Sequence, residues 1–239
     1  MSEFETNSNS NSNTPDSGCG KHYTLVFCFR TILINNQEQK QILLGFKKRG
    51  VGQGLYNGYG GKIDATDKSY IDGARRELQE ECGLLAGESL NRIGYLVETV
   101  DSLNMKFHIH VYTCTDWVSD TTDCHLTYPN PVADTDADTD VDTVSISTTS
   151  NIDSKSKYPE PVETDEMRPL WFNLDAIPFQ QMWIDDPYWF PYLLDNIQFI
   201  GRFELKREDF VSFYSVTNVK TNKTIKQSFE DSDSESDIE

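Results

Sequence analysis

Three glutamates on one predicted helix are the residues of this chain whose types and spacing could do chemistry. Glu77, Glu80 and Glu81 stand at positions i, i+3 and i+4, so a turn of about 100° per residue places their carboxylates on one face. Like charges side by side repel one another and raise the carboxyl pKa values unless a cation lies between them. Carboxylate oxygens suit Mg²⁺, which commonly bridges carboxylates to phosphate oxygens. The spacing therefore predicts a site for metal-assisted phosphate hydrolysis.

A loop, a helix and a stop signal surround these glutamates in the segment Gly60–Leu84. Ser69 and Asp72 form a short capping box, which predicts that the helix begins there. Gly83 stands where a left-handed residue is expected to end the helix. A solvated acidic helix is the alternative interpretation, but it would not require the glycines on either side. The buried stripe of the helix is predicted from apolar residues at helical spacing: Ile71, Ala74, Leu78 and Cys82.

The run Arg76–Leu84 reads RELQEECGL and resembles the Nudix box, REUxEExGU with U an apolar residue. That pattern marks hydrolases that cut a diphosphate linkage with the help of Mg²⁺, with Mn²⁺ as an alternative ion. The resemblance implies a catalytic group of Arg76, Glu77 and Glu81, in which Arg76 orients a glutamate through a bidentate ion pair. Glu81 is the expected general base, with Glu166 as its rival. The implied metal ligands are Gly60, Glu77, Glu80, Glu81 and Glu166.

The loop half of this segment departs from the family pattern of Gly, five residues, Glu, seven residues and Arg-Glu. Counting back from Arg76 places the glutamate at Lys68, whereas counting forward from Gly61 places it at Asp67. We therefore predict a loop that is one residue longer, with Asp67 as a displaced substitute. Gly60 and Gly61 predict a turn where the backbone approaches metal or phosphate closely, a simple strand-to-loop turn being the alternative.

Four further runs resemble Nudix hydrolases that act on oxidised purine nucleoside triphosphates. They are YTLV, LLGFKKRGVGQGLYNGYGGK, ETDEMRPLWF and MWIDDPYWFP, and they lie in this order between about Lys21 and Val219. The resemblance implies Mg²⁺-dependent hydrolysis of substrates such as 8-oxo-dGTP and 2-hydroxy-dATP to the monophosphate and pyrophosphate, which sanitises the nucleotide pool. The substrate-binding residues carried over by position are Thr24, Lys47, Asn57, Tyr59, Gly60, Gly61, Lys62, Trp183, Ile184, Asp185 and Asp186.

The last of these runs predicts the base pocket. Trp183 offers a flat face on which a purine can stack. Asp185 and Asp186 stand at a predicted helix start, where either could act as a cap. If both instead share an apolar pocket, repulsion and desolvation leave one carboxyl neutral, so the pair offers a donor and an acceptor. We therefore predict tolerance of both oxidised guanine and oxidised adenine. The pocket also departs from the family pattern, since Val51 replaces a bulky aromatic residue and residues 97–99 lack another.

Two other functions stay open beside this one. The chain could hydrolyse another nucleoside diphosphate-linked substrate, such as a dinucleoside polyphosphate or an unmodified nucleotide, and the pocket departures leave this alternative open. It could also be a non-catalytic module that senses a nucleotide. Loss of the box carboxylates would favour that second alternative, but all of them are present.

Composition predicts one domain with polar extensions. The chain has 239 residues and a formal net charge of −18. Residues 21–219 are expected to form a single Nudix domain, interrupted by a low-complexity acidic insert at about 115–158. Residues 1–20 and 220–239 are expected to be disordered tails, because such polar segments bury too little apolar surface to offset the entropy of ordering.

The same composition limits the partners and the compartment. The acidic excess argues against a nucleic-acid polymer as partner, which leaves a small nucleotide substrate. No apolar run approaches the roughly 18 residues of a membrane span, and no targeting segment is visible. Five cysteines without a framework spacing predict reduced thiols. We expect a cytoplasmic monomer, with the nucleus as a second compartment.

Two other metal sites are disfavoured by the spacing of their candidate ligands. The alternating aspartates of residues 134–142 lack the glycine and the closing glutamate of a calcium loop. His108, His110, Cys114, Cys124 and His125 match no zinc-ligand spacing. We expect His108 and His110 to lie on one face of a strand.

The remaining elements are predicted from alternating and β-branched runs. Strands are expected at 23–29, 41–47, 93–100, 106–114 and 169–174, and a hairpin at 199–205 and 211–219. A second helix is expected to start at Asp186-Pro187 and to run to about Asp195, with proline in the first helical position. This order predicts an α+β fold, a Nudix-type α/β/α sandwich with a mixed β-sheet between helices.

Overall fold

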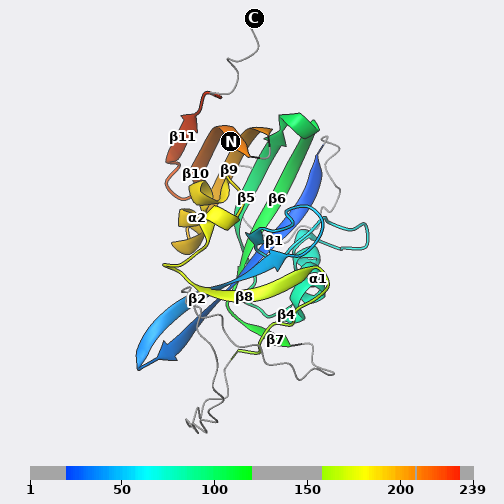
Figure 1. Ribbon diagram of the computed structural model, residues 1–239, viewed down its shortest axis with the longest axis vertical. Coiled ribbons are helices and arrows are strands. Elements are labelled where there is room, and N and C mark those ends of the chain that lie inside the picture. Colours follow the sequence, from blue (N-terminus) through cyan, green and yellow to red (C-terminus); the bar gives the residue numbers. More distant parts are fainter. Residues whose placement is uncertain (1–19, 120–157, 208, 232–239) are drawn as a thin grey trace, which may run out of the picture.

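The computed structural model describes residues 20–119, 158–207 and 209–231. In that part of the chain, strands dominate and two α-helices flank them (Figure 1). The helical segments are α1 (Tyr70–Cys82), α2 (Asp186–Leu194) and the short 3₁₀ turns η1 (Asp101–Leu103) and η2 (Phe179–Gln181). The strands of the first half are β1 (Lys21–Ile34), β2 (Gln37–Lys47), β3 (Tyr56–Asn57), β4 (Leu84–Ala86), β5 (Asn91–Val100), β6 (Met105–Cys114) and β7 (Trp117–Ser119). The second half adds β8 (Met167–Asn173), β9 (Phe199–Arg207), β10 (Phe210–Asn218) and β11 (Thr224–Ser228).

One mixed sheet organises the described chain. Its strand order is β11-β10-β9-β5-β6-β1-β2-β3, and β8 pairs with β2 on the edge opposite β3. The β1–β6 and β5–β9 pairs are parallel, whereas β1–β2, β5–β6 and β9–β10 are antiparallel. Strands β4 and β7 form a separate two-stranded sheet. The long hairpin of β1 and β2 turns at Asn35 and Asn36, both of which adopt positive φ.

The two helices cover opposite faces of this sheet. Alternation along β1 sends Leu25 and Phe27 into the core that contains Phe190 of α2. Val26 and Cys28 point the other way, into the core that contains the buried stripe of α1. The predicted sandwich with a mixed sheet between helices is therefore confirmed.

The predicted strands are present, with several longer than expected, but two boundaries were wrong. The tail expected to be disordered from residue 220 contains β11, which pairs with β10 from Thr217↔Thr224 to Phe213↔Ser228. The first end of the insert forms β7, and Tyr158 at its second end packs on Trp117. The aspartates of residues 134–142, Cys124 and His125 lie outside the described residues.

His108 and His110 do lie on one face of β6, as predicted. Their rings stack with His22, whose Nδ1 lies 3.1 Å from Nε2 of His110. Tyr70 covers His110 at a ring distance of 3.9 Å. The described ranges hold no helix that is both long and apolar enough to cross a membrane.

We expect Phe190→Ala to lower the free energy of unfolding by about 3–5 kcal/mol, because it removes a fully buried ring and leaves a cavity. Leu33→Ala is the matched control, since Leu33 is 72% exposed at the hairpin end and its loss should cost less than about 0.5 kcal/mol. Urea unfolding monitored by tryptophan fluorescence measures both. Equal losses in the two variants would contradict this description of the core.

Candidate functional site

Helix α1 holds the three glutamates, and its ends are those predicted. The Ser69 hydroxyl accepts a hydrogen bond from the Asp72 backbone N–H, and Gly83 ends the helix with φ 70°. Ala74, Leu78 and Cys82 of the predicted stripe are fully buried against the sheet. This packing fixes the rotation of the helix, so the glutamate face turns toward the loop that contains Gly60 and Gly61.

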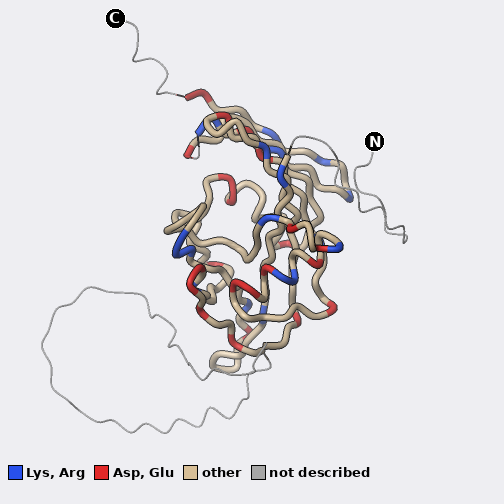
Figure 2. The backbone as a smooth tube through the Cα atoms, turned by 90° about the vertical axis from the view of Figure 1, so that its right-hand side faces the viewer, with Lys and Arg blue, Asp and Glu red and all other residues tan. Residues whose placement is uncertain are grey.

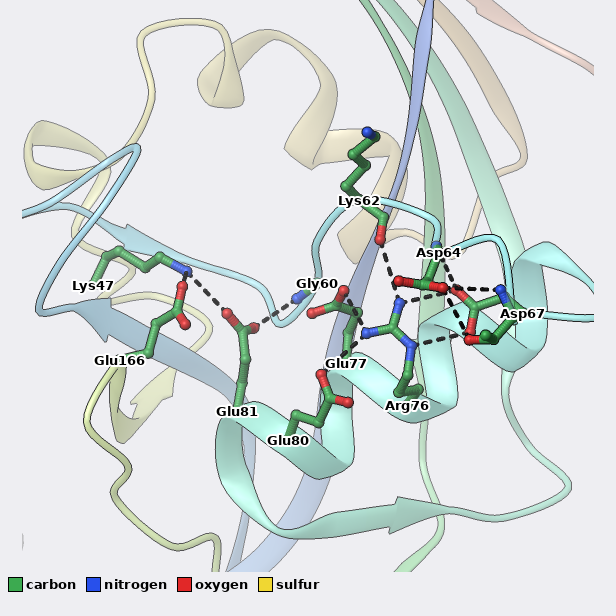
Figure 3. Close-up of polar contacts among 11 residues, drawn as sticks. Lys47, Gly60, Lys62, Asp64, Asp67, Arg76, Glu77, Glu80, Glu81 and Glu166 are labelled. Atoms are coloured by element: carbon green, nitrogen blue, oxygen red, sulfur yellow. Dashed lines mark hydrogen bonds and ion pairs between the residues drawn. The ribbon is translucent and has the colours of Figure 1, made fainter.

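Arg76 ties the loop to the helix (Figure 3). Its Nε and Nη2 donate to the two carboxylate oxygens of Asp67 at 3.0 and 2.9 Å. Its Nη1 donates to Glu77 at 2.9 Å and to Glu80 at 3.0 Å. The bidentate partner of Arg76 is thus Asp67, the displaced acid of the loop, and each glutamate receives a single bond. The Arg76 guanidinium holds the pKa of Asp67 below its usual range.

Lys47 ties a second pair of carboxylates together. Its Nζ donates to Glu81 at 2.9 Å and to Glu166 at 2.5 Å (Figure 3). Glu166 lies there because the register of β2 and β8 pairs Lys47 with Met167. Glu81 also accepts the Gly60 backbone N–H at 2.8 Å. Burial nevertheless outweighs these contacts and raises the pKa of Glu81 to about 7, and burial raises the pKa of Glu77 as well.

The two loop glycines have no room for a side chain. A Cβ on Gly60 would lie 1.9 Å from the Thr24 carbonyl oxygen of β1. A Cβ on Gly61 would lie 2.6 Å from both carboxylate oxygens of Glu77. The loop backbone is held against β1 by hydrogen bonds from Thr24 N to Gly61 O and between Val26 and Tyr59. The glycines therefore let the backbone reach both the central strand and the carboxylates.

The carboxylates form two groups, one around Arg76 and one around Lys47. Within the described residues, no three acidic, histidine or cysteine side chains converge closely enough to hold an ion in this arrangement. The donor set nevertheless fits a hard divalent cation, because it consists of carboxylate oxygens on one rigid helix face. The raised pKa values of Glu77 and Glu81 show that their charges lack full compensation, which a bound cation would supply.

A cavity of about 360 Å³ opens beside the Lys47 group. Lys47, Glu166 and the loop glycines line one part of it, and Trp183, Asp185 and Asp186 line another. The Thr24 hydroxyl oxygen is buried on this wall and finds no hydrogen-bond partner in the described part of the chain. The cavity therefore connects Lys47, which binds the helix glutamate Glu81, with a polar group that a ligand could satisfy.

Asp185 and Asp186 are buried and neither caps α2. The Trp189 indole N–H donates to Asp185 Oδ2 at 3.1 Å, and the Trp183 backbone N–H donates to Asp186 Oδ2 at 3.1 Å. Burial raises the pKa of Asp185 to about 6 and raises that of Asp186 well above its usual range. The neutral and ionised pair inferred from the sequence is thus favoured by the surroundings of both carboxyls.

Comparison with known proteins places the chain among its relatives. A family model described as NUDIX domain matches residues 28–193. The chain belongs to the Nudix family. The chain is 34% identical over 198 residues to the oxidized purine nucleoside triphosphate hydrolase of Mus musculus, covering 82% of this chain and 94% of that protein. It is 35% identical over 182 residues to the protein of the same name from Danio rerio, covering 75% and 88%.

A solved structure supports the Nudix fold independently. The MutT protein from Bacillus halodurans superposes with a TM-score of 0.54 at 15% identity, over 82% of this chain and 97% of that one. Together with the relatives, the family match makes this chain a Nudix pyrophosphohydrolase.

Three of the expected substrate-binding side chains are not part of the cavity wall in this Nudix fold. Tyr59 is fully buried in the core beneath α1. Lys62 is exposed and extends away from the carboxylates, with only its carbonyl oxygen accepting from Arg76 (Figure 3). Ile184 is 39% exposed and is not among the residues that line the cavity. Similarity by position gave the segment correctly but could not give the direction of each side chain.

Glu98 is a cavity residue that was not predicted. It lines the cavity on β5 and hydrogen-bonds to Asp185. A charged residue among the alternating apolar positions of this strand was the one signal in the sequence.

The Nudix glutamate Glu81 should make metal-free stability depend on pH. Its folded pKa is about 7 against an ordinary 4.5, so the folded state binds the extra proton between these values and loses that advantage as pH rises. We expect this residue to lower the free energy of unfolding by up to about 3 kcal/mol between pH 4.5 and 7, since one pKa unit is ~1.4 kcal/mol. Urea unfolding in a chelating buffer measures it. If the free energy of unfolding of Glu81→Gln changed with pH in parallel with that of the wild type, this expectation would be contradicted.

Asp67→Asn should loosen the Nudix loop, because an amide offers Arg76 one acceptor and no charge in place of two charged hydrogen bonds. We expect a loss of about 1.5–3 kcal/mol in the free energy of unfolding. Asp175→Asn, an exposed position, is the control and should change little. Identical stabilities for the two variants would show that Asp67 does not support Arg76.

Proposed function

We propose that this protein hydrolyses oxidised purine nucleoside and deoxynucleoside triphosphates, with Mg²⁺, to the monophosphate and pyrophosphate. The observation that carries the proposal is a cavity lined both by Lys47, which binds the Nudix-helix residue Glu81, and by the buried Asp185 and Asp186. A triphosphate fits the first part because metal and Lys47 can neutralise it. A purine fits the second part because Trp183 offers a flat face beside paired donors and acceptors.

The metal would be held by the carboxylates of Glu77, Glu80, Glu81 and Glu166, together with the Gly60 carbonyl oxygen. When bound, it supplies positive charge that neutralises the triphosphate and polarises the phosphorus–oxygen bonds. Lys47 then exchanges its carboxylate partners for phosphate oxygens and holds the chain of phosphates in the cavity. Arg76 is the positioning residue, since it fixes Glu77 and Glu80 from the solvent side.

Glu81 is the proposed general base. Burial raises its pKa to about 7 in the metal-free site, which suits proton transfer near neutral pH, and the Gly60 N–H holds its carboxylate in place. Glu81 removes a proton from a water molecule as that water attacks the β-phosphorus. The bond between the β-phosphorus and the bridging oxygen breaks, and the electron pair leaves with the nucleoside monophosphate. Pyrophosphate carries the oxygen of the attacking water.

The end of the cavity proposed to hold the base can recognise the hydrogen-bond donors and acceptors on the edge of a purine. At pH 7 Asp185, with a pKa of about 6, is ionised and accepts N–H groups, while the raised pKa of Asp186 favours its neutral form, which can donate to a carbonyl or ring nitrogen. Such a pair accommodates purines whose edges differ. The identity to the mouse and zebrafish hydrolases supports the same substrate class.

A dinucleoside polyphosphate is the second candidate substrate. Val51, at the cavity wall, is 81% exposed, so one side of the base end lacks a bulky cover. A wider mouth could admit a second nucleoside. Figure 2 shows basic and acidic segments interleaved along the described chain, so local cations such as Lys47, Lys48 and Arg49 can offset its net negative charge near a polyanion.

A substrate panel tests the proposal. With Mg²⁺, we expect pyrophosphate release to be fastest from 8-oxo-dGTP and 2-hydroxy-dATP, slower from dGTP, and slowest from a dinucleoside polyphosphate. Glu81→Gln should lower kcat by roughly 10²–10⁴-fold, because it removes the proposed base. Glu88→Gln, an exposed site after β4, is the matched control and should keep wild-type rates. Equal rates for dGTP and 8-oxo-dGTP would overturn the sanitising role.

A further inference from the structure

Glu98 occupies an apolar position in the middle of β5. Its neighbours on the same face of the strand, Leu96 and Val100, are both buried in the core that contains α2. All three side chains line the cavity. A carboxyl group in such a position costs free energy unless it is hydrogen-bonded, and an apolar residue would complete the core at lower cost. Packing alone therefore does not explain why a carboxyl group stands at this position.

Glu98 completes a set of three carboxyl groups at one end of the cavity. Glu98, Asp185 and Asp186 line the same cavity, and the Glu98 carboxyl lies within hydrogen-bonding reach of Asp185. Burial raises the pKa of Glu98 well above its usual range. Lys47 is the one basic residue among the cavity-lining residues of the described chain, and its amine binds Glu81 and Glu166. No cation from this wall therefore neutralises the three acids.

The hydrogen bond to Asp185 fixes how Glu98 can meet a ligand. A neutral carboxyl that donates its O–H to Asp185 keeps its carbonyl oxygen as an acceptor. The unpartnered Thr24 hydroxyl on the same cavity wall is an independent sign that a polar ligand fills this space. The expected ligand is a base that carries an N–H group in addition to those read by Asp185.

We propose that Glu98 is a third base-recognition residue, and that its carbonyl oxygen selects purines that carry hydrogen on an imidazole-ring nitrogen. The proposal rests on the function proposed above. Guanine presents a lone pair at N7, which a carbonyl oxygen repels. An 8-oxopurine in its keto form presents N7–H, which the same oxygen accepts. Glu98 thereby distinguishes the oxidised from the ordinary base at the position that oxidation changes.

The test compares variants that lack the acceptor with one that keeps it. Glu98→Leu and Glu98→Met should each lower the kcat/KM ratio of 8-oxo-dGTP to dGTP by about tenfold, since a polar site discriminates by leaving groups unpaired. The loss should be larger for 8-oxo-dGTP than for 2-hydroxy-dATP, which has no N7–H. Glu98→Gln should keep most of the preference, because its amide can donate to Asp185 and its oxygen still accepts.

Glu204→Leu is the matched control. Glu204 is exposed on β9 and follows Phe203, the residue paired with Glu98, so it faces away from the cavity. The kcat/KM ratio of 8-oxo-dGTP to dGTP in Glu204→Leu should equal that of the wild type. Thermal unfolding identifies which of the Leu and Met variants are folded, and Glu98→Gln should unfold at the wild-type temperature.

The outcomes separate this inference from the function on which it rests. A wild-type protein that cleaves none of the triphosphates overturns the proposed function itself. A wild type that prefers 8-oxo-dGTP, with an unchanged ratio in folded Glu98→Leu or Glu98→Met, overturns only the role of Glu98. An equal loss of kcat/KM for all substrates in the Leu and Met variants also overturns the role of Glu98. A ratio of 8-oxo-dGTP to dGTP in Glu98→Gln as low as that of the Leu variant does so too.

Discussion

The close approach of the Gly60-Gly61 backbone to β1 is the constraint on which the rest of the site depends. A side chain at Gly60 would collide with the Thr24 carbonyl, and one at Gly61 with the Glu77 carboxylate. Because the loop is pressed between strand and helix, the Gly60 N–H can hold Glu81 and the Lys62 carbonyl can hold Arg76. The central strand, the loop and the Nudix helix thus act as one rigid support.

Two cations with different properties divide the carboxylates of this support. Arg76 is always charged and is fixed by Asp67, so the carboxylates around it keep their cation in every state of the site. Lys47 is a flexible point charge between Glu81 and Glu166, so it can move to a phosphate when those carboxylates take up a metal ion. The metal-free site is therefore kept together by a side chain that also serves the substrate.

Local signals made parts of this structure predictable. Caps and an apolar period fixed both ends of α1, and the displaced acid Asp67 was identified by counting. β11 was not predicted because Thr224–Ser228 is exposed throughout and shows no alternation of buried and exposed residues. Tyr59 was expected to bind substrate, but its side chain is buried in the core. Similarity by position does not give the direction of a side chain. The role of Glu98 depends on Asp185, which directly precedes α2 and comes close to β5 only because that helix packs on the sheet.

The packing of α1 on the sheet has a chemical consequence for the thiols beneath it. Cys28 and Cys82 are fully enclosed there, and their surroundings raise the pKa of both thiols. Peroxides attack the thiolate form at accessible sites, so neither residue offers what an oxidant needs. These two thiols beneath the helix that positions the glutamates are thereby protected under the same oxidising conditions in which the proposed substrates form.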